Sequence, residues 1–302
     1  MKRLMLLSCL LLVVSLLAGC GLKSESAFYY YSPSWVSDGR IILIGATETK
    51  DKDTFGAQIG SSYSEYVITI NSTGTDESPS LFDATGAPPY SMSCSPTNDY
   101  VAYMDELRNN MFSKIIIRST TLEAFTGLEM LELNFANKIK SFDWSSDGTK
   151  IAYCTTTEVR VRDWNDFTGA TDTLITAESD LQFVSWKYGG RIAFVYSSAG
   201  TLRLGLIYPD ASGRIDLAAA ASVDYPQISA TNTNEVYGVN GTSYGKVDVS
   251  AGTPAFTSIK ASFGGSLPRL SPDSTKVTYS KTGQSTGIYL LTVATEVETQ
   301  IK

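Results

Sequence analysis

The sequence predicts an all-β protein, a six-bladed β-propeller of four-stranded antiparallel blades. The main observation is a repeat: an apolar run ends in an anchor residue, a tight polar turn follows, and a second apolar run begins. Over residues 141–153 it reads SFDWSSDGTKIAY. The turn chemistry is suitable, because Asp can bond the backbone two residues on and Gly accepts a positive φ. Six such repeats have the anchors Trp35, Cys94, Trp144, Trp186, Ile228 and Leu270, and the last four anchors are 42 residues apart. A period near 40 with several short strands is typical of propeller blades.

Length and composition agree with this fold. The chain has 302 residues, most of which six blades of that period would use, so we expect a single domain over residues 28–302. Tyr, Thr, Ser, Val and Ile are plentiful, as β-sheet surfaces favour. We find no amphipathic helical pattern longer than a turn or two after the first 20 residues.

The first 19 residues have the features of a secretory signal rather than of a folded element. Lys2 and Arg3 form a short basic start, and an apolar run from Leu4 to Leu17 follows. This run is too short for a comfortable membrane span. A basic start, an apolar stretch and small residues before a cleavage point are the parts of a signal peptide. We therefore expect residues 1–19 to be removed.

The end of this segment, Leu17-Ala18-Gly19-Cys20, resembles the lipobox of bacterial lipoproteins. The resemblance implies cleavage before Cys20, a diacylglyceryl group on its thiol, and acylation of the new amine by a fatty acid such as palmitate. Residues 20–27 would then form a short tether to the envelope membrane. In that family an Asp after the Cys retains the protein at an inner membrane, and Gly21 stands here, so an outer membrane is favoured where two exist. An ordinary signal peptide or an uncleaved anchor is the alternative.

The expected strands can be placed blade by blade. In blade one they lie near residues 29–35, 40–45, 65–70 and 80–83, with a long polar loop, Thr47–Ser64, between the second and the third. Blade two has a charged loop, Asp105–Asn110, before the strand at 115–117. Alternating apolar residues indicate further strands at 159–162, 202–208, 247–249 and 288–293, and the last outer strand lies at 296–301.

The repeat resembles that of the TolB-like six-bladed propellers, which carry W-S-P-D-G followed by an I-A-F/Y strand. The best matches are residues 144–153 and Ser271–Ser274 with Val277–Tyr279, and the resemblance covers residues 28–302. It implies the fold and says little about function. TolB also has a preceding α/β domain that this sequence lacks, so the role of TolB itself is not implied.

Several kinds of chemistry are excluded by what the sequence lacks. It contains no histidine, which excludes Ser-His-Asp and Cys-His catalysis and histidine-based zinc sites. The polysaccharide lyases among TolB-like propellers rely on histidine, so that activity is not implied either. No phosphate loop or dinucleotide fingerprint occurs. We therefore expect no catalysis, no cofactor and no metal. A glycan-active enzyme with two carboxylates in the central funnel is the alternative.

The net charge limits which classes of partner we expect, and the surroundings of the cysteines in the sequence indicate whether they form a disulfide. The formal net charge is −7 at pH 7 and there is no basic cluster, so nucleic acid is a poor partner. Cys94 and Cys154 both resemble small buried hydrophobic residues, which favours free thiols over the disulfide that an exported protein permits. We expect a monomeric, lipid-anchored scaffold for an envelope protein, polymer or other ligand.

The loops predict which face of the propeller binds. The turns between the first and second strands are short and nearly uniform, which indicates a structural role; they are Val36–Gly39, Ser95–Asn98, Ser145–Gly148, Lys187–Gly190, Ser229–Asn232 and Ser271–Ser274. The opposite face carries the two longer loops, Thr47–Ser64 and Asp105–Asn110. Function tends to concentrate in loops on a rigid scaffold. We expect a partner to dock there, with Phe55, Tyr63 and Glu106 among its contacts.

Overall fold

The computed structural model of the chain describes residues 23–53, 57–75, 82–83, 90–97, 100–107, 112–119, 131–166, 168–281 and 287–302. Cys20, Phe55 and the expected signal segment lie outside these residues. Within them, no helix is both long and apolar enough to cross a membrane.

The described strands form six four-stranded antiparallel sheets, as the sequence predicts. Blades one and two contain β1 (Lys23–Trp35), β2 (Ile41–Lys52), β3 (Gln58–Ile70) and β4 (Phe82–Asp83), then β5 (Tyr90–Cys94), β6 (Tyr100–Leu107), β7 (Phe112–Ser119) and β8 (Leu131–Ile139). Blades three and four contain β9 (Ser141–Trp144), β10 (Lys150–Cys154), β11 (Glu158–Asp163) and β12 (Thr173–Ala177), then β13 (Leu181–Ser185), β14 (Ile192–Ser198), β15 (Thr201–Ile207) and β16 (Ile215–Asp216). Blades five and six contain β17 (Asp224–Ile228), β18 (Glu235–Asn240), β19 (Ser243–Asp248) and β20 (Phe256–Lys260), then β21 (Ser266–Leu270), β22 (Lys276–Lys281), β23 (Gly287–Thr292) and β24 (Glu298–Gln300).

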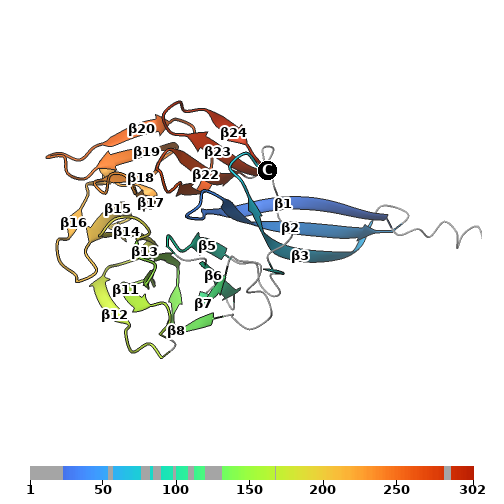
Figure 1. Cartoon of the computed structure of the whole chain (residues 1–302), viewed down its shortest axis with the longest axis horizontal. Coiled ribbons are helices and arrows are strands. Elements are labelled where there is room, and N and C mark those ends of the chain that lie inside the picture. Colours follow the sequence, from blue (N-terminus) through green and yellow to red (C-terminus); the bar gives the residue numbers. More distant parts are fainter. Residues whose placement is uncertain are drawn as a thin grey trace, which may run out of the picture.

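The blades are arranged in a ring with the first strand of each blade innermost (Figure 1). Each first strand contacts the first strands of its neighbours: β1 with β5 and β21, β9 with β5 and β13, and β17 with β13 and β21. The predicted anchors end these strands. Trp186 is the one exception, since it lies one residue beyond β13. Five of the six predicted anchors therefore lie on the innermost strand of their blade, and the sixth follows directly after it.

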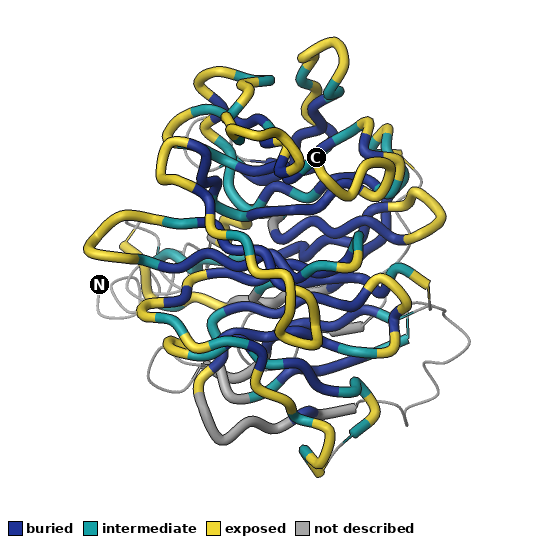
Figure 2. Tube along the Cα trace, turned by 90° about the vertical axis from the view of Figure 1, so that its left-hand side faces the viewer, coloured by how far each residue is buried: buried dark blue, intermediate teal, exposed yellow. Residues whose placement is uncertain are grey.

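The hydrophobic core is divided into layers between adjacent blades, and the exposed residues gather in the connections (Figure 2). Between blades two and three, for example, Met104 and Ile117 pack with Phe142 and Trp144. Trp144 has no exposed surface. Each anchor therefore fills the seam between two sheets, which explains why the anchors are large or apolar and why their spacing follows the blades.

Blades one and six meet without exchanging a strand, because each contains four strands of its own. The seam is closed by packing of Trp35, Ile41 and Leu43 against Ile288 and Leu290. Non-covalent contacts between the two ends of the folded chain therefore hold the ring shut.

One prediction for blade one is wrong: Thr47–Ser64 is not a long loop. β2 continues to Lys52 and β3 begins at Gln58, with Thr47 opposite Ser64. β1 also begins at Lys23, inside the expected tether, and pairs with β2 as far as Lys52. Residues 23–28, 47–52 and 58–64 thus form a three-stranded extension, here called the arm, that projects beyond the other blades (Figure 1). The polar composition of Thr47–Ser64 indicates an exposed segment, but it does not distinguish a hairpin from a loop, because both are polar when exposed.

Blade two shows the same effect on a smaller scale, since β6 continues to Leu107 and includes the first part of the expected loop Asp105–Asn110. The prediction for the cysteines is confirmed. Cys94 and Cys154 are free and buried, and burial raises the pKa of the Cys154 thiol to about 12.

Candidate functional site

The turns between first and second strands are held by their own side chains. Asp147 accepts hydrogen bonds from the hydroxyl of Ser145, at 2.6 Å, and from the backbone nitrogen of Thr149, at 3.0 Å. The bond from Ser145 holds the pKa of Asp147 below its usual range. Asp273 makes the same contacts with Ser271 and Thr275. These acids stabilise the turns, in agreement with the structural role that the sequence indicates.

The arm lies on the other face, because the connection between second and third strands is at the opposite end of the blade. Its side chains bond across the strands: Ser24 to Asp51 at 2.7 Å, and Ser26 with Thr49 at 3.0 Å. Ile59 in β3 is 57% exposed. The arm is therefore internally paired, and it presents an apolar side chain to solvent.

The outer edge of β3 has no described strand beside it within the arm. β4 pairs only with Tyr66 and Val67, which lie nearer the ring. Among the described strands, β2 is the one that pairs with Gln58–Ser64. A sheet edge of this kind is a template on which another chain can add a strand.

A surface cleft of about 460 Å³ lies on the same face, between blades four and five. It is lined in part by Thr201 and Leu202 at the start of β15 and by Asn240 at the end of β18. Leu202 is 44% exposed. Asp224 also lines the cleft, and burial raises the pKa of its carboxyl group.

The expected contact residues are only partly brought together. Tyr63 lies in the arm, where its backbone is opposite Glu48. Glu106 lies near the end of β6, in the next blade and on the same face. Phe55 is outside the described residues. The docking role of these residues remains a prediction.

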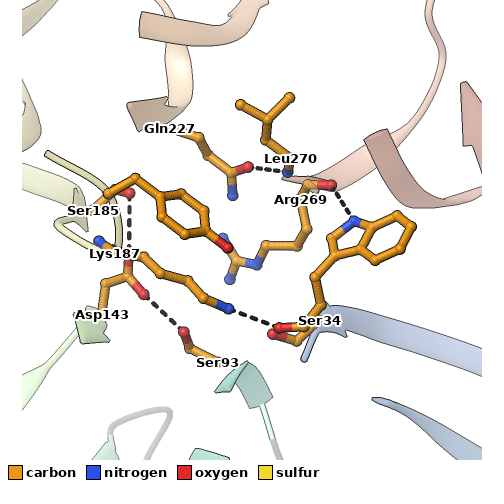
Figure 3. Close-up of a pocket in the computed structure, with 10 residues that line it drawn as sticks. Ser34, Ser93, Asp143, Ser185, Lys187, Gln227, Arg269 and Leu270 are labelled. Atoms are coloured by element: carbon orange, nitrogen blue, oxygen red, sulfur yellow. Dashed lines mark hydrogen bonds between the residues drawn. The ribbon is translucent and has the colours of Figure 1, made fainter. Parts of the chain in front are cut away.

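A second candidate site, the axial pocket, lies at the anchor ends of the innermost strands (Figure 3). The residue directly before each anchor lines it, and these six residues, here called the axial ring, are Ser34, Ser93, Asp143, Ser185, Gln227 and Arg269. Lys187 and Tyr188 complete the polar lining. The space open to the centre of a water-sized molecule is about 20 Å³.

Asp143 is the carboxylate of this ring, and it is 8% exposed. One of its oxygens accepts from the Ser93 hydroxyl at 2.7 Å and from the backbone nitrogen of Trp144 at 3.0 Å. The other accepts from the Ser185 hydroxyl at 3.0 Å and from the backbone nitrogens of Trp186 and Lys187 at 2.9 and 3.1 Å. Asp143 thereby joins blades two, three and four.

Two positively charged side chains, those of Lys187 and Arg269, line the axial pocket. Lys187 is 9% exposed, and its ammonium donates to the carbonyl of Trp35 at 2.8 Å, across the ring from blade four to blade one. The guanidinium of Arg269, from blade six, lies over the ring of Phe183 with its carbon 5.6 Å from the ring centre. Burial lowers the pKa of both groups. The turn Lys187–Gly190 therefore has a second role besides reversing the chain, because it supplies a positively charged side chain to the pocket.

The chemistry of the axial pocket does not suit a pair of catalytic acids. A glycosidase of the usual kind needs two carboxyl groups across the bond that it breaks. Among the described residues lining this pocket, Asp143 is the one carboxylate, and five donors already occupy it. The carboxylate enzyme considered as the alternative function gains no support here.

No family model and no curated protein sequence matches the chain. Among solved structures, it is similar to a chain in the crystal structure of a nidogen/laminin complex, with 9% identity and a TM-score of 0.57 over 91% of this chain and 92% of that one. It is also similar to TolB from Acinetobacter baumannii, with 14% identity and a TM-score of 0.51 over 79% of this chain. Solved TolB structures share this propeller fold. The match spans 65% of that TolB chain, and at these identities the similarity shows the fold alone.

Sequence analysis missed the axial pocket, although a signal for it was present. The residue before the anchor is polar in all six repeats. Because side chains alternate along a strand, the residue before each anchor faces the other side of its sheet, and at this end of the innermost strands these positions border the axial pocket. The six polar positions could therefore have been assigned to a common channel. The inward course of Lys187 could not, since its turn has no such alternation.

Proposed function

We propose that this protein is a lipid-anchored interaction scaffold of the cell envelope, and that the arm is its main docking element. The observation that carries this proposal is the arm itself: its paired backbone, the edge along Gln58–Ser64 that has no described strand beside it, and the exposed Ile59. The fold adds support, since propellers of this kind include a chain from a complex of two proteins, nidogen and laminin. Catalysis has no part in the proposal.

The position of the arm relative to the lipid anchor adds a constraint. Lys23 is opposite Lys52 at the outer end of the arm, and Cys20 precedes it by three residues. An acylated Cys20 would hold this end about 10 Å from the bilayer at most, given the length of an extended residue. Six paired residues of β1 at about 3.3 Å each would then separate the ring from that end by roughly 20 Å. A partner docked on the arm would lie between the membrane and the ring.

The outer edge of β3 in the arm determines which kind of partner segment we expect. An added strand binds through its backbone, so the partner would supply an extended segment rather than a helix or a glycan. An apolar residue beside Ile59 would add burial of apolar surface. We expect the scaffold to be monomeric, with this edge occupied by another protein.

The docking face is tested by crosslinking in cells that produce the protein. A photoreactive amino acid is placed at Ile59 in one variant and at Val297 in another. These residues have matched exposure, 57% and 56%, but Val297 precedes the outer strand of blade six, away from the arm. We expect one defined protein adduct from Ile59 and none of that mass from Val297. Equal adducts from both positions would contradict docking on the arm.

The anchor is tested separately. Cells are labelled with a fatty-acid analogue, and the wild type is compared with Cys20→Ser. We expect label on the wild type alone, because the thiol of Cys20 is the proposed attachment point. Two or more acyl chains, each CH₂ contributing about 0.8 kcal/mol, would give stable attachment. Equal labelling of the two proteins would reject the anchor and leave the docking face undecided by this test.

A further inference from the structure

The charges of the axial pocket are not balanced by the described residues that line it. Lys187 and Arg269 supply two cations, and Asp143 supplies one carboxylate. The hydrogen bonds of Asp143 all come from hydroxyl groups and backbone nitrogens. Within the described part of the chain, neither cation forms a salt bridge. The pocket thus holds an excess positive charge.

Lys187 and Arg269 also have N–H donors without an acceptor among the described residues. An ammonium group has three donors and a guanidinium has five. The ammonium of Lys187 uses one donor, to Trp35, and the guanidinium of Arg269 has no hydrogen bond to a described residue. Taking charged groups out of water is costly unless they are paired and hydrogen-bonded. Lys187 is 9% exposed and Arg269 is half-buried, and most of that compensation is missing among the described residues.

Both cationic groups point into the same space. Figure 3 shows the side chain of Arg269 reaching down into the middle of the pocket and Lys187 crossing below it. They come from different blades, so the ring, and not one loop, fixes their separation. The hydroxyl of Ser34 also lines this pocket, where it accepts a hydrogen bond from the backbone nitrogen of Cys94 at 3.0 Å.

We propose that the axial pocket binds one small monovalent anion of about the size of chloride, between Arg269 and Lys187. The anion would neutralise the excess charge and accept the unused N–H donors. The open space of about 20 Å³ suits a single atom-sized ligand and is too small for a sugar phosphate or a nucleotide. Because this site lies at the ring ends opposite the arm, it is independent of the proposed docking function.

Loss of a proton from Lys187 is the competing way to reduce the charge. It would balance the charge against Asp143, but the guanidinium of Arg269 stays protonated in proteins and its N–H donors would still lack acceptors among the described residues. A water molecule could accept one or two of the N–H groups, but it would carry no charge. A bound anion would both supply negative charge and accept hydrogen bonds from the N–H groups.

The proposal is tested by crystals of the whole chain grown in sodium bromide, with data collected at the bromine absorption edge. We expect an anomalous peak within hydrogen-bonding distance of the Arg269 guanidinium and the Lys187 ammonium. The peak should vanish in Arg269→Gln and persist in Lys246→Gln, which removes a cation that pairs with Glu235 on the surface. A pocket without the peak at molar bromide would overturn the proposal.

A solution measurement keeps the test independent of the variants. The wild-type melting temperature is followed as chloride replaces gluconate, an anion too large for the pocket, at constant ionic strength. A ligand that binds only the folded state stabilises it by RT ln(1 + [L]/Kd), so the stabilisation grows with the ligand concentration. We expect the melting temperature to rise with chloride. The same temperature in both salts would contradict the site, whether or not Arg269→Gln folds.

Discussion

The indole nitrogen of Trp35 donates a hydrogen bond to the backbone carbonyl of Arg269, 3.0 Å away. This bond joins the first blade to the last. Trp144 makes the equivalent bond to the carbonyl of Ser93, at 2.9 Å, between blades three and two. The seam that closes the ring is therefore built like an ordinary interface between blades, even though no described strand crosses it.

The two tryptophans provide a matched test of ring closure. Trp35→Phe and Trp144→Phe each lose one hydrogen bond from an indole nitrogen to a carbonyl of the neighbouring blade, a loss of about 0.5 to 1.5 kcal/mol. We expect similar losses of unfolding free energy, measured by urea titration. An undiminished stability in Trp35→Phe, with a clear loss in Trp144→Phe, would mean that the seam is open in solution.

Gly74 provides a second test of the seam. Its φ is +78°, and a Cβ added there would lie 2.1 Å from the carbonyl oxygen of Ile301, next to the last residue. Gly39 has a similar φ of +86° and open space around it. Both Gly→Ala variants carry the backbone cost of about 1 to 2 kcal/mol, and Gly74→Ala adds a clash with the main chain. We expect Gly74→Ala to have the lower melting temperature; equal values would show that Ile301 does not lie against Gly74.

The turns predict how stability responds to acid. Hydrogen bonds lower the pKa of Asp147 in the folded state, so its contribution to stability is complete above the unfolded pKa near 4. That contribution is lost as the pH falls further, through the folded pKa. Asp147→Asn keeps an oxygen acceptor but removes the titration. We expect the variant to lose less stability than the wild type between pH 5 and pH 2, measured by denaturant midpoints; parallel curves would contradict this.

The arm should be dispensable for folding. Its described cross-strand bonds are between exposed polar side chains, and such contacts contribute little to stability. Replacing Glu48–Tyr63 with a two-residue Asn-Gly turn should leave the unfolding free energy of the ring within about 1 kcal/mol of the wild type, since Asn-Gly suits a tight hairpin. Calorimetry checks this. A large loss would place the arm within the ring's own cooperative unit.

The sequence predicts the ring well, because each anchor must fill the seam between two sheets, and the spacing of Trp144, Trp186, Ile228 and Leu270 records the size of a blade. It predicts the arm poorly. Thr47–Ser64 is polar on both faces, so alternation carries no information there and only the pairing with β1 reveals strands. The axial pocket depends on residues from all six blades that meet at one point. The polar residue before each anchor marks six of these positions in the sequence, whereas the entry of Lys187 into the pocket follows from the folded turn and has no such signal.

The central claim is that the arm is where a partner binds. The most direct measurement is the affinity of the purified protein for the partner crosslinked at Ile59, compared between the wild type and the variant in which Asn-Gly replaces Glu48–Tyr63. With the ring shown to be folded, we expect at least a tenfold loss of affinity, equivalent to about 1.4 kcal/mol of binding free energy. An unchanged affinity in the shortened variant would contradict the account.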